Sequence, residues 1–171
     1  MKKIRFGVIG CGSIANEYHL PALRRVEGAQ LVWACDLIEE RAQKAKDDFG
    51  FEKYTLDYHD ILNDSSIDAV CIFTKIEMHA TLCIEAAAAG KHIFSQKPFA
   101  YNIEEGRKII RAVDEAGVKL TPSFMHSYMD GSIAARRIVE EGKIGEIRHI
   151  RMRNATKNPF DSAPGYGGCM M

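Results

Sequence analysis

The sequence has no long apolar run, no excess of charge of one sign, and no cluster of cysteines or histidines. No apolar segment approaches the roughly 20 residues that a membrane-spanning helix needs, so we expect no membrane partner. The 23 basic residues are matched by 23 acidic ones, which argues against nucleic acid as the main partner. The basic start soon reaches glycines and polar residues, unlike a signal peptide, and we expect a cytoplasmic protein.

The five cysteines are an odd number, and no two of them have C-x-x-C spacing. Cys35 and Cys71 lie inside apolar runs, where cysteine usually behaves as a small core residue. The six histidines are scattered, without a pair at metal-ligand spacing. The sequence therefore predicts neither a disulfide framework nor a metal site.

What the sequence does contain is a regular alternation of apolar strands with amphipathic helices. Short loops between such elements indicate an α/β fold with a doubly wound parallel sheet. The strands are predicted over residues 3–9, 30–35, 67–73, 91–94 and 118–121. The helices are predicted from the first glycine-rich turn to about residue 25, and over residues 39–49, 57–62, 77–89 and 102–117.

The last of these helices has a clear start signal. Asn102 and Glu105 form a capping-box-like pair at its first turn. The spacing of its apolar residues predicts that it buries Ile109, Ile110 and Val113.

The pattern of the sequence changes after residue 121. A helix is predicted over residues 132–141, and residues 147–153 alternate in the way that is typical of a half-buried strand. We therefore predict a nucleotide-binding domain over residues 1–122. Residues 123–171 are predicted to hold a connecting helix and the incomplete start of a second α/β domain with an open sheet.

A glycine-rich turn follows the first predicted strand directly and opens a helix. It reads Gly10-Cys-Gly12-Ser13-Ile14-Ala15. Gly10 permits a tight turn, Gly12 lets a pyrophosphate approach the backbone, and Ala15 is small where the helix packs on the strand. The helix N-terminus, which includes Ser13 and Ile14, adds free N–H groups and a positive dipole for the phosphates. The motif in this setting predicts a dinucleotide site.

An acidic residue ends the second strand where this motif requires one. The carboxylate of Asp36 can accept hydrogen bonds from both ribose hydroxyls and would repel a 2′-phosphate, so we favour NAD over NADP. Arg41, one turn into the next helix, is a candidate cofactor contact that would soften this preference. The alternative is that the glycines only form a turn and that Asp36 only caps the next helix.

The segment Gln96-Lys97-Pro98 follows the strand that is predicted to end at Phe94. In an open α/β sheet, ligands bind at the carboxyl ends of the strands, so Lys97 can face a substrate or a cofactor. A lysine on a loop is equally compatible with a solvated surface charge, and both interpretations stay open at this point.

Six segments carry a resemblance to a known family: VIGCGSIANEYHLPAL (8–23), IDAVCIFT (67–74), His79, AAAAGKHIF (86–94), QKPFA (96–100) and EEGKIGEIRHI (140–150). Together they resemble the N-terminal part of the Gfo/Idh/MocA family of nicotinamide-dependent oxidoreductases. The resemblance implies a Rossmann domain followed by an α/β domain whose open sheet often forms an oligomer interface. We therefore expect the full-length protein to be a homo-oligomer.

The resemblance also implies roles for single residues. Lys97 is expected to point at the nicotinamide and the substrate, and its peptide bond to Pro98 is often cis in such proteins. Thr74 is expected near the ribose and phosphates. His79 is expected on the nicotinamide side, with a buried, structurally satisfied histidine as the alternative. Gln96 stands where the family usually has a glutamate, and we count it among the cofactor-binding residues.

The family's catalytic Asp and His, spaced Asp-x-x-x-His, come shortly after a glycine-rich segment. Residues 165–168 are expected to begin that segment, and the 171 residues end before such a pair. We therefore expect this chain alone to be inactive.

The leading interpretation is an NAD-dependent oxidoreductase. It would transfer a hydride between the nicotinamide and a sugar, polyol or related hydroxy compound, with Lys97 stabilising developing alkoxide charge. The alternative is a non-catalytic NAD(P)-binding regulatory module, or an inactive fragment of such an enzyme. Gln96 and the absent Asp–His pair favour this alternative.

Overall fold

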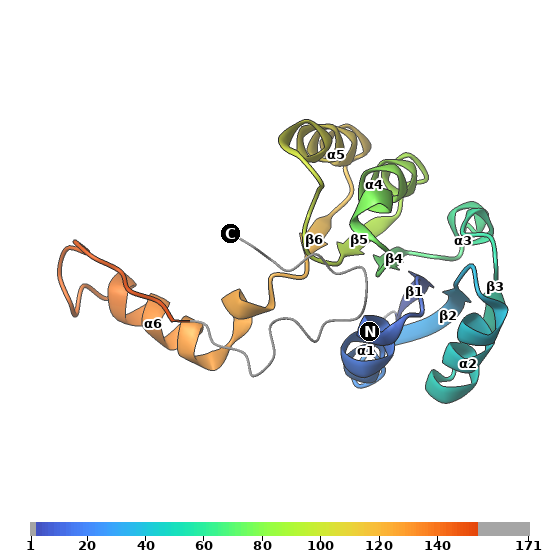
Figure 1. Cartoon of the computed structure of the whole chain (residues 1–171), viewed down its shortest axis with the longest axis horizontal. Coiled ribbons are helices and arrows are strands. Elements are labelled where there is room, and N and C mark those ends of the chain that lie inside the picture. Colours follow the sequence, from blue (N-terminus) through green and yellow to red (C-terminus); the bar gives the residue numbers. More distant parts are fainter. Residues whose placement is uncertain (1–2, 154–171) are drawn as a thin grey trace. The chain divides into compact units, whose positions relative to one another are not determined.

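The computed structural model describes residues 3–153, and these divide between Met125 and His126 into two compact units. The first unit is built on a six-stranded sheet of order β3-β2-β1-β4-β5-β6 (Figure 1). Every neighbouring pair in it is parallel, which confirms the predicted sheet. The strands are β1 (Ile4–Ile9), β2 (Ala29–Cys35), β3 (Lys53–Thr55), β4 (Ala69–Ile72), β5 (His92–Ser95) and β6 (Leu120–Pro122).

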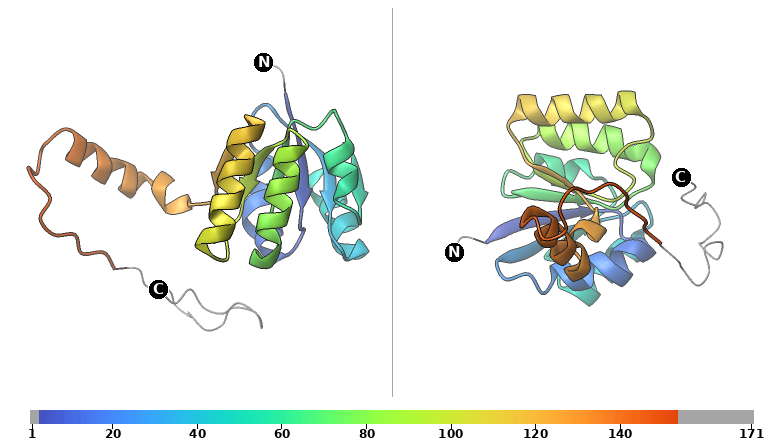
Figure 2. Two further views of the ribbon diagram at one scale, coloured as in Figure 1. Left: turned by 90° about the horizontal axis from the view of Figure 1, so that it is seen from above. Right: turned by 90° about the vertical axis from the view of Figure 1, so that its left-hand side faces the viewer.

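Helices cover both faces of this sheet (Figures 1 and 2). One face carries α1 (Leu20–Leu23) and α2 (Glu39–Phe49), and the other carries α3 (His59–Asn63), α4 (His79–Ala88) and α5 (Ile103–Ala116). Two short helical segments, the π-helical η1 (Ala15–His19) and the 3-10 turn η2 (Ile76–Met78), lead into α1 and α4.

Successive residues of the central strands belong to two separate cores. In β4, Val70 and Ile72 pack with α3, α4 and α5, whereas Cys71 packs with α1 and α2. In β1, Val8 and Ile9 divide between the cores in the same way. Because side chains alternate across a strand, a sheet that is covered on both faces needs an almost continuous apolar run. This is the pattern that the sequence has in these strands.

The order in which the chain adds strands to the sheet reverses between β1 and β4. From β1 the chain continues outward to β2 and β3, and it then returns to the other side of β1 as β4. Where the strand order reverses, the loops at the carboxyl ends of the strands diverge and leave room for a ligand. The loops after β1, β2, β4 and β5 therefore define the region in which a site is expected.

Two local predictions in the first unit are wrong. Strand β3 was not predicted, because its three residues are too short for a periodic signal and are recognised only by their pairing with β2. Ile110, predicted to be buried, is 50% exposed, because the buried face of α5 follows Gly106, Ile109 and Val113 instead. The predicted cap of α5 is confirmed, since Asn102 Oδ1 accepts a hydrogen bond from the Glu105 N–H at 2.8 Å.

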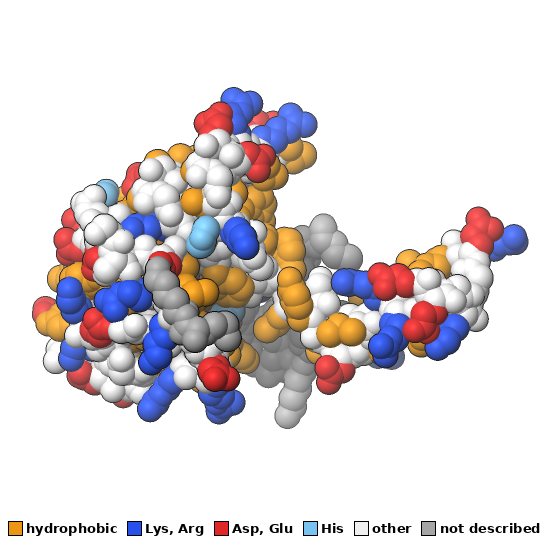
Figure 3. Space-filling model, turned by 180° about the vertical axis from the view of Figure 1, so that it is seen from behind, with side chains coloured by type: hydrophobic (Ala, Val, Ile, Leu, Met, Phe, Trp, Pro, Cys, Tyr) orange, Lys and Arg blue, Asp and Glu red, His pale blue; other side chains and the backbone are white. Residues whose placement is uncertain are grey.

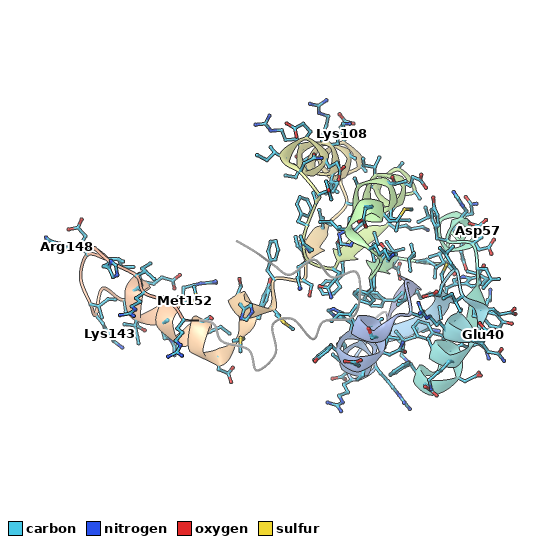
Figure 4. The ribbon with its side chains drawn as sticks, viewed as in Figure 1. Glu40, Asp57, Lys108, Lys143, Arg148 and Met152 are labelled. Carbon is cyan, nitrogen blue, oxygen red and sulfur yellow. The ribbon has the colours of Figure 1, made fainter. Side chains whose placement is uncertain are left out.

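The described part of the second unit contains α6 (Asp130–Glu140), close to the predicted helix. After α6 the chain turns back, and Lys143, Arg148 and Met152 project from this stretch (Figure 4). The strand predicted over residues 147–153 is wrong for the described chain. A strand needs a neighbour to satisfy its backbone, and no described strand pairs with these residues.

Lys and Arg side chains are interspersed with Asp and Glu on the face of the molecule that Figure 3 shows, in keeping with the balanced composition. Across residues 3–153, no helix is long and apolar enough to cross a membrane.

Candidate functional site

The glycine-rich turn after β1 depends on a glycine at its first position. Gly10 has φ +97°, and a Cβ atom there would lie 2.7 Å from the carbonyl oxygen of Phe73. Its N–H donates to the carbonyl of Cys35 at 2.8 Å, so the turn lies against the end of β2. A side chain at this position would be strained and would push the ends of β1 and β4 apart.

The second half of the turn faces open space. A Cβ atom on Gly12 would meet nothing within 4 Å, and Ser13 is exposed. Ser13 and Ile14 start the helical stretch that continues through η1, and Ala15 is fully buried against the sheet. An open backbone at a helix N-terminus, on a buried small residue, fits a pyrophosphate.

Asn16 is a residue of this turn that the sequence reasoning missed. Its Nδ2 donates to the carbonyls of Cys11, at 2.6 Å, and Gly12, at 2.8 Å. Its N–H also donates to the Gly12 carbonyl at 3.0 Å. Asn16 therefore fixes the conformation of the turn from inside the first helical turn. An amide side chain four residues after the second glycine was the available signal.

Asp36 joins the glycine turn to the end of β2. Its Oδ2 accepts from the Cys11 N–H at 2.8 Å and its Oδ1 accepts from the Ile38 N–H at 2.9 Å. Each oxygen can accept a further hydrogen bond. Asp36 thus holds both the glycine turn and the start of the next helix, and its contact with a ribose stays a prediction. Arg41 is exposed, and its guanidinium forms no hydrogen bond or ion pair with any described residue, whereas its N–H donates to the carbonyl of Ile38 at 3.0 Å.

The thiols of Cys11 and Cys35 are buried close to the Asp36 carboxylate. Burial, and then the charge of Asp36, raises the pKa of Cys11 and of Cys35 to about 12. Both side chains are therefore neutral core groups, as predicted for Cys35. The described residues contain no group of three or more His, Cys, Asp or Glu side chains that could hold a metal ion.

The turn after β5 presents Lys97 to solvent. The peptide bond between Lys97 and Pro98 is cis, and the Lys97 N–H donates to Oε1 of Gln96 at 2.7 Å. The Lys97 ammonium has no hydrogen bond or ion pair within the described part of the chain. A lysine that is exposed at the carboxyl edge of the sheet and has no structural partner is free to contact a ligand.

Gln96 is a buried member of the same turn, with 5% of its surface exposed. Its N–H donates to the carbonyl of Ile72 at 2.9 Å, which continues the pairing of β5 with β4. Its Nε2 lies 2.9 Å from Nε2 of His19, in η1. Gln96 therefore connects the lysine turn with the helix that follows the glycine turn.

His79 connects the loops after β4 and β5. The ring is 1% exposed, with Nδ1 2.9 Å from the carbonyl oxygen of Pro98 and Nε2 3.2 Å from that of Thr74. A neutral imidazole has one N–H, so the ring donates to one of these two carbonyls and packs against the other. Since the ring is buried between the two loops, His79 acts on a ligand only through the loops that it joins. Thr74 is half-buried, and its hydroxyl donates to the carbonyl of Lys75 at 3.3 Å.

The candidate site therefore has two halves at one edge of the sheet. The phosphate half is defined as the glycine turn with Asp36, after β1 and β2. The lysine half is defined as the residues after β4 and β5, namely Thr74, His79, Gln96, Lys97 and Pro98. Residues 165–168, expected to begin the family's glycine-rich segment, lie outside the described residues.

Comparison with known proteins agrees with this fold. The profile of the Gfo/Idh/MocA oxidoreductase family, described as an NAD-binding Rossmann fold, matches residues 4–124. Inositol 2-dehydrogenase from Salmonella paratyphi B is 31% identical over 165 residues, which cover 94% of this chain and 49% of that protein.

Two solved structures are also similar. Scyllo-inositol dehydrogenase from Lactobacillus casei, with bound NAD(H) and scyllo-inositol, has a TM-score of 0.79 at 28% identity, over 85% of this chain and 43% of that one. A 3-ketoreductase from Actinomadura kijaniata, in complex with NADP and TDP-benzene, has a TM-score of 0.78 at 29% identity, over 86% and 45%. The chain spans about half the length of the curated relatives that it matches.

Proposed function

Since the chain belongs to the Gfo/Idh/MocA family of oxidoreductases, we propose that it is the cofactor-binding part of an NAD-dependent dehydrogenase. The substrate class is a sugar, polyol or related hydroxy compound. The observation that carries the proposal is that the glycine turn, Asp36 and Lys97 follow the carboxyl ends of three strands, β1, β2 and β5, of one parallel sheet. The relatives include dehydrogenases of inositols and a 3-ketoreductase.

The phosphate half fits a dinucleotide. Gly12 leaves open space above the backbone at a helix N-terminus, and Asp36 offers carboxylate oxygens beside it. In this proposal the N–H groups of Ser13 and Ile14 bind the pyrophosphate, while Asp36 accepts hydrogen bonds from the ribose hydroxyls.

We propose NAD as the preferred cofactor. A 2′-phosphate would bring negative charge next to the Asp36 carboxylate. The guanidinium of Arg41 forms no ion pair with this carboxylate that would neutralise its charge. One relative binds NAD(H) and another binds NADP, so family membership alone does not fix the cofactor and the proposed preference rests on Asp36.

The lysine half supplies polarisation. A bound nicotinamide would accept or deliver the hydride, and the protein would orient the reacting groups. The Lys97 ammonium would donate a hydrogen bond to the oxygen of the reacting alcohol and stabilise negative charge on it. His79 and Gln96 would hold the turn that carries this ammonium.

The rest of the protein would complete the substrate pocket. We propose that residues 123–171 connect the nucleotide-binding domain to a substrate-binding domain, and that the full-length protein is a homo-oligomer. The proposal rests on the family and on the relatives being about twice as long as this chain.

A second function from another class is a non-catalytic NAD(P)-binding regulatory module. The observation that favours it is Gln96, an uncharged amide where the family usually has a carboxylate next to the lysine. Such a module would bind the nucleotide with the same phosphate half and would not need the Lys97 ammonium.

Titration of the protein with NADH and with NADPH, followed by thermal unfolding, tests nucleotide binding. NADH at 100 times its dissociation constant should add about 2.7 kcal/mol to the unfolding free energy. No stabilisation by either nucleotide would refute both functions, and stronger stabilisation by NADPH would refute the role of Asp36.

Turnover by the full-length protein separates the two functions. A panel of inositols and sugars with NAD should show reduction of the cofactor, and Lys97→Met should lower turnover by about 100-fold or more while NADH still binds. Nucleotide binding without turnover on any member of the panel would favour the regulatory module.

A further inference from the structure

The amide of Gln96 has one orientation that satisfies its neighbours. Its Oε1 lies 2.7 Å from the Lys97 nitrogen, which is a backbone N–H and therefore only a donor. The other end of the amide, Nε2, must then face His19 Nε2 at 2.9 Å. The reversed amide would place two donors against each other at Lys97.

This orientation determines the protonation of His19. The amide Nε2 is only a donor, so His19 Nε2 must be the acceptor and must carry no proton. The neutral ring then holds its proton on Nδ1. A glutamate at position 96 would accept from both sides, and it would therefore favour a proton on His19 Nε2.

The surroundings of His19 also disfavour a charged ring. The imidazole stacks on Phe73 with the ring centres 4.3 Å apart and meets the edge of Phe94 at 5.7 Å. It lines an apolar pocket of about 280 Å³ between α1 and the sheet. Burial lowers the pKa of His19 below its ordinary value of 6.5.

Among the described residues that line this pocket, no charged side chain offsets the effect of burial on the pKa of His19. From β4, the one titratable neighbour that lines the pocket is the thiol of Cys71, whose pKa burial raises to about 12. From the β5 side, Gln96 is uncharged. Glu17, on η1 itself, is exposed and forms no ion pair with His19 within residues 3–153.

We propose that Gln96 is a positioning residue that works through His19. It uses the neutral imidazole as a hydrogen-bond acceptor, and it thereby joins the helix of the phosphate half to the backbone of Lys97 in the lysine half. This inference rests on the proposed function, because the site that it organises is the proposed nicotinamide site.

The arrangement has a direct consequence at acidic pH. Protonated His19 would point a second donor at the Gln96 amide, and the amide could then satisfy its neighbours only by leaving the Lys97 N–H. Because the folded pKa of His19 is lowered, its contribution to stability is present above pH 6.5 and is lost as the pH falls through the folded pKa. The connection between the two halves should therefore loosen on acidification.

The test is nuclear magnetic resonance of the histidine ring nitrogens between pH 5 and pH 8, without nucleotide. In the unmodified protein, His19 should be neutral near pH 7 with its proton on Nδ1. In Gln96→Glu, the proton should move to Nε2 and the pKa of His19 should rise by about one unit or more, as beside other carboxylates. Gln43→Glu makes the same chemical change at an exposed position on α2, and it should leave His19 unchanged.

A functional measurement distinguishes a positioning role from a merely structural one. The dissociation constant for NADH should increase as His19 is protonated in the unmodified protein. Gln96→Glu should remove this pH dependence, because the carboxylate accepts from His19 Nε2 and from the Lys97 N–H whether or not the ring is charged. A proton on Nε2 in the unmodified protein would overturn the inference. The inference would also be overturned if the dissociation constant of the unmodified protein for NADH did not change while His19 titrates.

Failure of the proposed function would look different. The ring signature of His19 is read without nucleotide, so a protein with that signature that binds neither NADH nor NADPH at any pH would refute the nucleotide site and the positioning role with it. A protein that binds NADH normally, but has His19 protonated on Nε2, would refute the positioning role alone.

Discussion

The two halves of the candidate site are held together by different kinds of contact. In the phosphate half, backbone groups bond to each other or to the side chains of Asp36 and Asn16. The Gly10 N–H donates to the Cys35 carbonyl, Asp36 accepts from the Cys11 N–H, and Asn16 donates to two carbonyls of the turn. In the lysine half, two buried side chains connect separate loops, His79 with the carbonyls of Thr74 and Pro98, and Gln96 with His19. We therefore expect the phosphate half, which is held by backbone groups, to tolerate few substitutions at its glycines. In the lysine half, which is held by side chains, a single substitution should remove one contact and leave the others in place.

The largest expected effect is in the phosphate half. Gly10→Ala should lower the unfolding free energy by about 3 kcal/mol, because the backbone has φ +97° and the new Cβ would lie 2.7 Å from the Phe73 carbonyl oxygen. Gly50→Ala is the control, since Gly50 also has a positive φ, +78°, but open space around it. In urea denaturation, the control should lose about 1 kcal/mol of unfolding free energy. Equal losses would show that the close approach of β1 and β4 is unimportant.

The second largest effect is expected from a substitution of His79 in the lysine half. His79→Leu should cost about 2 kcal/mol of unfolding free energy, because the loop carbonyl that accepts from the ring loses its buried donor. The control is the exposed His59, whose ring lies near the carboxylates of Asp57 and Glu85 and stacks on Tyr58. His59→Leu should cost less than about 1 kcal/mol in the same denaturation experiment. A loss no larger than that of the control would mean that His79 does not hold the two loops together.

A smaller effect tests the ligand side of the phosphate half. Asp36→Asn should weaken NADH binding by about 10- to 100-fold, because an amide has one acceptor oxygen for the several donors that meet there. NADPH binding should suffer less, because the negative charge that opposes a 2′-phosphate is gone. Fluorescence titration with both nucleotides measures the two constants, with the exposed Asp48→Asn on α2 as the control. An unchanged ratio of the two constants would contradict the cofactor preference.

The smallest effect on stability is expected at the tip of the lysine half. Lys97→Met should change the unfolding free energy by less than about 0.5 kcal/mol, because the ammonium has no partner among the described residues. Lys91, before β5, is the contrast: it is 4% exposed and its Nζ donates to the carbonyls of Asp64, at 2.7 Å, and Ile67, at 3.0 Å. Lys91→Met should therefore cost about 2 kcal/mol or more. Similar losses in the two variants would indicate a structural role for Lys97.

The sequence predicted the elements whose signals are local. The apolar runs of β1, β2 and β4, the Asn102 cap and the Gly10–Ala15 turn were all recognisable within a few residues of themselves. The three residues of β3 carry no such signal, because pairing with β2 alone makes them a strand. The alternation over residues 147–153 was a strand signal without a described partner, and there the prediction was wrong.

The sequence by itself determined the chemistry of this protein: a glycine turn, an acidic residue at the end of the second strand and a Lys–Pro turn after the fourth predicted strand. These depend on backbone conformation and on residue type, which neighbouring residues largely specify. Only the tertiary structure decided that His19 meets Gln96, which joins the two halves, and that His79 lies between the two loops of the lysine half. Those partners are far apart in the chain, since 77 residues separate His19 from Gln96, and folding of the sheet brings them within hydrogen-bonding distance.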